Sequence, residues 1–297
     1  MQGAKKAEKK FKHSAIMNNI LVPKPEKLKT LIEKIAHDGR EHVHVIADFD
    51  RTLTKGLVDG KSKTALISIV QDKGYLWTDF TEQSRKNFDK YYPIEIDPNI
   101  PLEDKKKAMH ERWTKQNNLL IHSELTRNTI KDVVQQEKIP FREGHEIFFD
   151  LLQSNDIPLL IFSASGMGYD GIYYSLEKAK KLYDNIDIIS NAFIRDEEGR
   201  AIGVREPIIH TFNKDETVVK HFPIYEDIKD RKNILLLGDS LGDVDMANGF
   251  NYQNIIRIWF LNHDTPENRE KYLQKFDLLI LNDGPMDEVN AILKKIL

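Results

Sequence analysis

The sequence contains no cysteine. This absence excludes disulfide bonds, thiol catalysis and every metal site built on cysteine ligands, so a bound metal would have to be held by oxygen or nitrogen atoms. It also fits a reducing compartment. We therefore expect a cytoplasmic protein.

Long apolar runs are also missing. Runs such as Ile157 to Phe162 are too short to span a bilayer, and the N-terminus has no apolar signal region. We expect no membrane partner.

Neither sign of charge dominates the chain. The 44 basic and 47 acidic residues leave a formal net charge of −3, which is too balanced for a dedicated nucleic-acid binder. We expect a small-molecule partner, no polymeric nucleic acid, and a monomer. The Lys-rich start of the chain predicts a flexible basic tail over residues 1–24.

Continuous apolar runs alternate with helical patterns along most of the chain. The first run, in HVHVIA, ends at Ala47, and later strand candidates are Pro158 to Ser163, Ile186 to Ser190, Asn233 to Gly238, Ile255 to Leu261 and Asp277 to Leu281. Strands of this kind are buried on both faces, so the sequence predicts an α/β protein with a doubly wound parallel sheet. Residues 192–204 interrupt the alternation and predict a hairpin that turns at Glu198 and Gly199.

Between the first two strands the pattern is helical. Helices are predicted over Thr78 to Tyr91, Pro101 to Leu120 and Thr126 to Lys138, and an earlier one over Pro25 to Ala36. We interpret residues 63–138 as a helical cap inserted after the first strand. Residues 25–62 and 139–297 then form the α/β core.

Acids and hydroxyls follow three of the predicted strands. Asp48 and Asp50 follow the first strand, Ser163, Ala164 and Ser165 the second, and Asp239 and Asp243 the fourth. Open parallel sheets bind ligands at the carboxyl ends of their strands. The sequence therefore predicts a site at this edge.

Two close carboxylates can divide the work of phosphoryl transfer. The ionised one attacks phosphorus, and the protonated one supplies a proton to the leaving oxygen and later activates water. Because a carboxylate and a phosphate repel each other, such a site needs a divalent cation and an ammonium group. Asp239 and Asp243 add oxygen ligands that suit Mg²⁺.

Four motifs resemble those of the haloacid dehalogenase-like phosphohydrolases, in the same order. They are DFDRTLT from Asp48, FSAS from Phe162, Lys214 in FNKDE, and LGDSLGD from Leu237. Further segments, including YYPIEIDP, ERWTKQNNLL and REGHEIFFDLL, are similar to cytosolic 5′-nucleotidase type III, the pyrimidine and 7-methylguanosine-phosphate-specific 5′-nucleotidases. The likeness covers nearly the whole chain after the tail.

The resemblance implies Mg²⁺-dependent hydrolysis of nucleoside 5′-monophosphates through an aspartyl-phosphate. It makes Asp48 the nucleophile and Asp50 the general acid and base. The expected roles of the other residues are metal binding by Asp48, the Asp50 carbonyl and Asp239 with support from Asp243, phosphate binding by Ser163, the Ala164 backbone and Lys214, and base or sugar contact by Glu95.

The indole ring of Trp113 would stack on the base, and the stacking would attract a cationic 7-methylguanine base more strongly than a neutral base. The alternative is a core tryptophan, since Met109, Trp113 and Leu120 are close to helical spacing. Glu95 could equally face solvent on an extended segment.

Two departures from the family pattern stand at the site. Arg51 replaces the usual methionine, and SASGMGYD changes the loop after Ser163. Other functions therefore stay open: another phosphomonoesterase of this superfamily, a nucleoside phosphotransferase, or a binding protein that kept the fold and lost catalysis.

Overall fold

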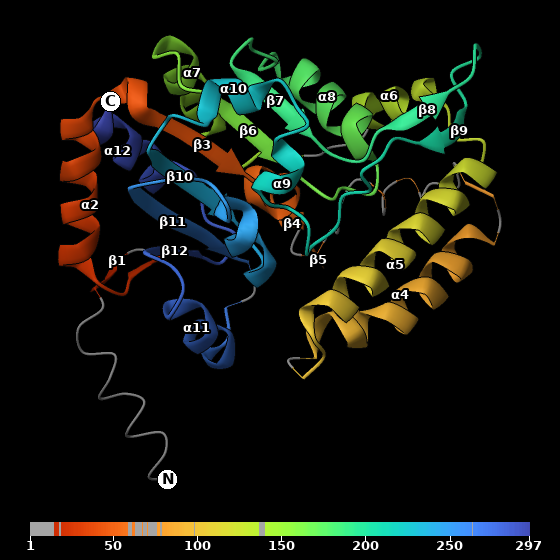
Figure 1. Ribbon diagram of the computed structural model, residues 1–297, viewed down its shortest axis with the longest axis horizontal. Helices are drawn as coiled ribbons and strands as arrows, with labels where there is room; N and C mark the ends of the chain where they lie inside the picture. The colour runs from red at the N-terminus through yellow and green to blue at the C-terminus, as the bar shows by residue number, and fades with distance from the viewer. Residues whose placement is uncertain are drawn as a thin grey trace, which may run out of the picture.

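An eight-stranded sheet forms the centre of the protein (Figure 1). The computed structural model describes residues 15–17, 19–58, 61–62, 67, 70, 76–77, 79–97, 99–136, 140–262 and 264–297. The strand order is β1-β2-β12-β11-β10-β3-β6-β7, and β12 to β7 run parallel. The strands are β1 (Ala15–Met17), β2 (Ile20–Val22), β3 (Val43–Ala47), β6 (Leu159–Phe162), β7 (Ile186–Ile189), β10 (Asn233–Gly238), β11 (Asn254–Leu261) and β12 (Leu278–Leu281).

The central parallel strands β3, β6 and β10 are buried on both faces, as the sequence predicts. In β3, Val45 and Ala47 join the apolar cluster on one side of the sheet, and Ile46 joins the cluster on the other. Successive side chains of a strand point to opposite faces, so a strand between two clusters favours apolar residues at successive positions. His44 of β3 is a buried polar exception.

Helices cover both faces of the sheet. One cluster includes residues of α2, α7, α8 and α12, and the other includes residues of α9 and α10. The bounds are α2 (Pro25–Asp38), α7 (His145–Ser154), α8 (Gly168–Ala179), α9 (Glu216–Val219), α10 (Ile224–Ile228), α11 (Pro266–Leu273) and α12 (Asp287–Ile296). Among the described residues, no helix is long and apolar enough to cross a membrane.

A pair of long helices projects beyond the sheet (Figure 1). These are α4 (Phe80–Ile96) and α5 (Leu102–His122), which lie side by side. Next to them is the predicted hairpin, formed by β8 (Phe193–Arg195) and β9 (Ala201–Val204). A second small hairpin pairs β4 (Leu57–Val58) with β5 (Lys61–Ser62).

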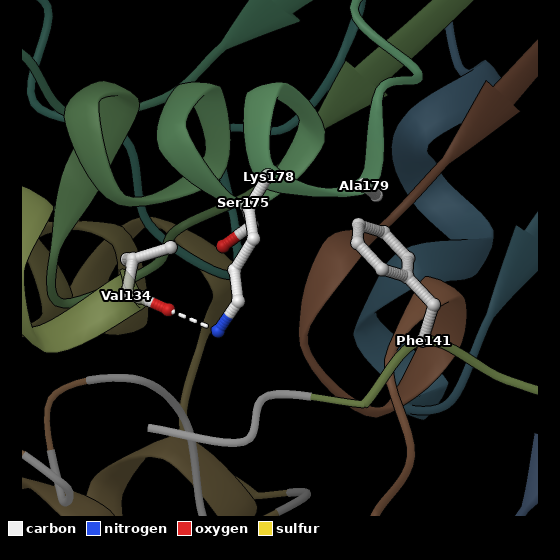
Figure 2. A pocket seen from close by; sticks show the side chains of 5 residues that line it. All are labelled: Val134, Phe141, Ser175, Lys178 and Ala179. Carbon is white, nitrogen blue, oxygen red and sulfur yellow. Dashed lines mark hydrogen bonds between the residues drawn. The ribbon is translucent and has the colours of Figure 1, made fainter. Parts of the chain in front are cut away.

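The third helix of the predicted cap lies against the core. Residues Ile130, Val133 and Val134 of α6 (Arg127–Gln136) belong to the same apolar cluster as α8. Lys178 of α8 donates to the Val134 carbonyl at 2.7 Å, beside a cavity of about 220 Å³ (Figure 2). The cap range of 63–138 therefore includes a helix that packs on the core; its ends at Lys63 and Lys138 lie outside the described residues.

The structure corrects two expectations from the sequence. The flexible tail was expected to reach Lys24, but β1 and β2 lie within it and pair with the sheet next to β12. Residues 1–14 lie outside the described part. The second correction is the helix predicted to end at Tyr91, which continues past Pro93 to Ile96 as α4. Glu95 therefore lies in its last turn, which excludes the alternative of an extended segment.

Candidate active site

The predicted site residues follow three neighbouring strands. β3 lies between β10 and β6, and Ala47 pairs with Leu237 on one side and Ile161 on the other. Asp48 directly follows Ala47, so the strand pairing brings it next to the ends of β10 and β6. The carboxyl edge of the sheet thus gathers all three motifs, as predicted.

A tight turn from Phe49 to Thr54 follows Asp48 and contains Asp50. Asp48 and Asp50 are both extended, whereas Arg51 adopts a left-handed conformation with φ of 63°. The Thr54 N–H bonds back to the Phe49 carbonyl at 3.2 Å and closes the turn. The negative charge of Asp50 contributes to the raised pKa of Asp48. The two carboxylates therefore interact electrostatically.

Lys214 connects two of the acids. Its ammonium lies 2.8 Å from Asp48 Oδ1 and 2.7 Å from Asp243 Oδ1. All three side chains are nearly inaccessible to solvent, with exposed fractions of 4% for Lys214, 10% for Asp48 and 6% for Asp243. Asp243 is fixed from its other oxygen, which accepts hydrogen bonds from the Ser240 N–H and hydroxyl.

Asp239 completes a cluster of three carboxylates. One oxygen each of Asp48, Asp239 and Asp243 lies within 4.8 Å of the others. Lys214 contacts Asp48 and Asp243, and repulsion among the acids raises the pKa of Asp48 and Asp239, so a further cation would favour the ionised cluster. An all-oxygen site of this kind fits a hard divalent cation such as Mg²⁺.

Gly238 at the end of β10 lets this cluster form. A Cβ at that position would lie 2.5 Å from the Trp259 ring and 2.8 Å from the Asp243 Cβ. Both distances are too short for a real contact. The glycine is thus required for Asp243 to approach the strand end.

The pKa values reflect this crowding. Burial raises the pKa of Asp48 to about 7, and the charges of Asp243 and Asp50 add to the rise while Lys214 opposes it. Burial and the neighbouring acids also raise the pKa of Asp239, although Arg51 and Arg142 oppose the rise. For Lys214, burial alone would lower the pKa, but Asp243 and Asp48 hold it above its usual range. A cation at the acids would favour their ionised forms.

The segment after β6 is held by Asn191. Ser163 is buried, and its N–H donates to the Ile189 carbonyl at 3.0 Å. The Asn191 carbonyl accepts the Tyr169 N–H at 2.8 Å, and the Asn191 side chain exchanges two hydrogen bonds with the backbone of Ile209. Asn191 thereby joins the loop of Ser163 and Ala164 to the segment that leads to Lys214.

Glu95 lies at the contact between the long helices and the core. One of its carboxylate oxygens accepts from the Thr211 hydroxyl at 2.8 Å, and the other lies 2.6 Å from Arg112 Nη1. Thr211 is three residues before Lys214. Glu95 is therefore connected through a short segment to Lys214.

Trp113 follows Arg112 on α5 and is half-buried. The Arg112 guanidinium carbon lies 5.8 Å from the centre of the indole ring, and the indole N–H is buried with no hydrogen-bond partner among the described residues. Both the stacking role and the core role of Trp113 stay predictions.

Three residues near the site, Thr211, Arg112 and Arg142, could not be assigned a role from the sequence. Arg142 stands in the REG segment that carries the family resemblance, but nothing nearby in the sequence identifies its partners.

Comparisons with known proteins identify the family of the chain. Residues 51–297 match the model of the family described as pyrimidine 5′-nucleotidase (UMPH-1), a match that begins just after Asp50. The chain is 35% identical to a 7-methylguanosine phosphate-specific 5′-nucleotidase A of Xenopus laevis, over 91% of this chain and 93% of the relative.

Solved structures are similar as well. Cytosolic 5′-nucleotidase IIIB bound to cytidine superposes with a TM-score of 0.84 at 31% identity, over 94% of both chains. A haloacid dehalogenase family hydrolase from Salmonella enterica, with a TM-score of 0.54 at 15% identity over 86% of this chain and 72% of the other, shares the fold. The chain therefore belongs to the pyrimidine 5′-nucleotidase family and has the haloacid dehalogenase-like fold.

Proposed function

We propose that the protein is a Mg²⁺-dependent hydrolase of nucleoside 5′-monophosphates, with CMP and 7-methylguanosine monophosphate among its substrates. The observation that carries the proposal is the buried bridge from Lys214 to Asp48 and Asp243, with Asp239 beside it. The bridge brings a nucleophile, an ammonium group and cation ligands together at the carboxyl edge of the sheet.

In this proposal Asp48 attacks the phosphorus atom. A bond forms between its carboxylate oxygen and phosphorus, and the bond from phosphorus to the 5′ oxygen of the nucleoside breaks. Asp50 gives its proton to that leaving oxygen, then takes a proton from the water that splits the aspartyl-phosphate. Phosphate leaves, and both carboxylates return to their initial states.

The residues that would hold Mg²⁺ are the Asp48 and Asp239 carboxylates and the Asp50 carbonyl. Asp243 supports them through its bonds to Lys214 and Ser240. The ion would neutralise part of the charge that builds up on the phosphate. The three-acid cluster supports this assignment.

Phosphate oxygens would bind Lys214, the Ser163 hydroxyl and the Ala164 N–H. Lys214 supports the assignment because its ammonium contacts Oδ1 of Asp48, the proposed nucleophile. An ammonium so close to the nucleophile offsets its repulsion toward phosphate.

Glu95 and Trp113 are proposed to contact the base or sugar. Glu95 accepts one hydrogen bond on each oxygen, from Thr211 and Arg112, which leaves lone pairs for an amino group of a base. Stacking on Trp113 would contribute about 1 to 3 kcal/mol. Because 7-methylguanine is cationic and cytosine is neutral, Trp113→Ala should lower kcat/KM for 7-methylguanosine monophosphate more than for CMP. Equal losses of kcat/KM for the two nucleotides would indicate that Trp113 is a core residue and does not stack on the base.

The proposal is tested by phosphate release from a panel of phosphomonoesters. The panel contains CMP, UMP, AMP, GMP, 7-methylguanosine monophosphate and phosphoserine, each with Mg²⁺ and with EDTA. We expect the pyrimidine and methylated nucleotides to be hydrolysed fastest, EDTA to abolish release and Mg²⁺ to restore it. Preference for phosphoserine, or full activity after exhaustive chelation, would contradict the proposal. A cytoplasmic location and a monomeric state stay predictions.

A further inference from the structure

Two chain segments, one before and one after the predicted cap range, contact each other beside the first motif. The segment that leaves the first motif contacts the segment that returns before α7: Lys55 N–H donates to the Pro140 carbonyl at 2.9 Å, and Arg142 N–H donates to the Leu53 carbonyl at 3.0 Å. Thr54 and Phe141 form an antiparallel bridge between them. The returning segment therefore contacts the end of the turn that contains Asp50.

Arg142 is the residue at which the returning segment enters the core. Its side chain is fully buried, and its guanidinium carbon lies 4.0 Å from the centre of the Phe260 ring. A guanidinium has five N–H donors. A buried arginine with unused donors would be costly, so their partners decide what the residue does.

All five donors have acceptors. The Nε–H donates to the Thr52 carbonyl at 2.7 Å, and Nη2 donates to the Arg51 carbonyl and to Asn262 Oδ1. Nη1 donates to Asp283 Oδ1 and to the Gly284 carbonyl, each at 2.9 Å. The guanidinium thus joins the turn from Phe49 to Thr54, here called the catalytic turn, to the loops that follow β11 and β12.

Two of these partners hold the same stretch of chain independently. Asn262 donates from Nδ2 to the Arg51 carbonyl at 3.1 Å. The Asp283 carboxylate accepts the N–H groups of Gly56 and Leu57 at 2.7 and 3.0 Å. The hydrogen bonds of Arg142, Asn262 and Asp283 described here thus connect the backbone from Arg51 to Leu57 with the loops that follow β11 and β12.

The conformation at Arg51 explains why such support is needed. A non-glycine residue with φ of 63° lies in a region that L-residues rarely adopt. Its carbonyl receives two hydrogen bonds, from Arg142 and Asn262, which fix that conformation. Asp50, immediately before Arg51, takes its backbone direction from this turn.

We infer that Arg142 is a positioning residue for phosphoryl transfer: it fixes the Arg51–Thr52 backbone and thereby the placement of Asp48 and Asp50. The inference rests on the proposed phosphohydrolase activity. It differs from a purely stabilising role because it requires the chemical step to slow in molecules that are still folded.

The test compares Arg142→Lys with Arg195→Lys. Lysine keeps the charge but offers three donors on one atom, too few for acceptors spread around a planar guanidinium. Arg195 is a matched control, because its nearly buried guanidinium bonds to Asp170 and to the Leu125 and Gly199 carbonyls, away from the catalytic turn. Both variants should lower the melting temperature.

The kinetic readout separates the roles. With CMP, we expect Arg142→Lys to lower kcat by about 10- to 100-fold with little change in KM, because small misplacements of reacting groups cost this much. With p-nitrophenyl phosphate, which lacks a base, kcat should fall by a similar factor. Arg195→Lys should keep kcat within about threefold.

Asn262→Ala covers the case in which Arg142→Lys does not fold. It removes one bond to the guanidinium and one to the Arg51 carbonyl, and it should lower kcat by roughly 3- to 10-fold.

If Arg142→Lys or, failing that, Asn262→Ala melts earlier but keeps the wild-type kcat, Arg142 is structural and the inference is wrong. A fall in kcat with CMP but not with p-nitrophenyl phosphate would show that Arg142 acts on the contact with the base rather than on the reacting groups. That result would also contradict the inference. An inactive wild-type protein would instead reject the proposed function.

Discussion

Lys214 is the residue on which the charge balance of the site depends. Its ammonium is nearly inaccessible and contacts carboxylates on either side, from Asp48 and Asp243. Removal of one partner from a buried ion pair is strongly destabilising, because the remaining charge keeps its desolvation cost without compensation.

We predict that Lys214→Met loses both activity and stability. The free energy of unfolding should fall by about 3 kcal/mol, and kcat/KM should fall by roughly 10²- to 10³-fold because the phosphate loses a charged donor. Urea unfolding and phosphate release measure the two effects. Lys178→Met is the control, since that ammonium bonds to carbonyls at the end of α6. A Lys214→Met variant with near wild-type kcat/KM would move the ammonium role elsewhere.

His210 gives the protein a predictable response to acid. Burial lowers its pKa to about 4, and the charges of His110 and Lys106 on α5 add to the decrease. Its Nδ1 accepts the Phe212 N–H at 3.2 Å, which a neutral ring allows. Between pH 6.5 and 4 the unfolded chain therefore binds a proton at this histidine that the folded chain does not.

Stability should consequently fall as the pH decreases from 6.5 toward 4. At pH 5 the contribution of His210 amounts to roughly 2 kcal/mol. We predict that His210→Asn loses less stability than the wild type between pH 7.5 and 5, measured by urea unfolding. Comparison of the two proteins cancels the opposite contribution of Asp48, whose raised pKa favours the folded state at low pH. Parallel pH profiles would show that His210 titrates normally.

At the scale of single elements, α8 begins with a glycine that no other residue can replace. Gly168 has φ of 61°, and a Cβ there would lie 2.1 Å from the Asn191 carbonyl oxygen. That carbonyl belongs to the residue that holds the Ser163 loop and the segment before Lys214. The clash cannot be relieved without moving one of the two.

We predict that Gly168→Ala destabilises the protein by more than 1 kcal/mol and raises KM for nucleotides. Gly203→Ala is the matched control, because its Cβ would meet Ile194 at an ordinary 3.4 Å. Melting temperatures and steady-state kinetics of both variants decide the matter. If Gly168→Ala behaves like the control, the loop is not held as described.

The strands could be predicted better than their surroundings. β3, β6 and β10 are buried on both faces, so their apolar runs are visible in the sequence itself. The helix predicted over Thr78 to Tyr91 stopped too early: Pro93 is unfavourable inside a helix, so the sequence shows no sign that the helix reaches Glu95. In the structure α4 continues past Pro93, where Lys105 and Arg112 of α5 bind the backbone and carboxylate of Glu95. Contacts from another helix overrode the local preference.

At the scale of the whole molecule, the site could be predicted only in part. Asp48, Asp239, Asp243 and Lys214 could be expected together, since three of them follow parallel strands and Lys214 stands in a family motif; the structure confirms that they meet. The support from Arg142 could not be predicted, because its side-chain partners are 90 to 142 positions away in the sequence. Only the closed fold brings these segments together.

The central claim is that the phosphoryl group passes through Asp48. The direct measurement is acid quenching of the protein during turnover of CMP labelled with ³²P, followed by peptide mapping of the label. We predict label on the peptide that contains Asp48, and none in Asp48→Asn, whose turnover should fall by on the order of 10³-fold or more because an amide does not attack phosphorus. Label on a different residue, or an Asp48→Asn protein that hydrolyses CMP at the wild-type rate, would contradict the account.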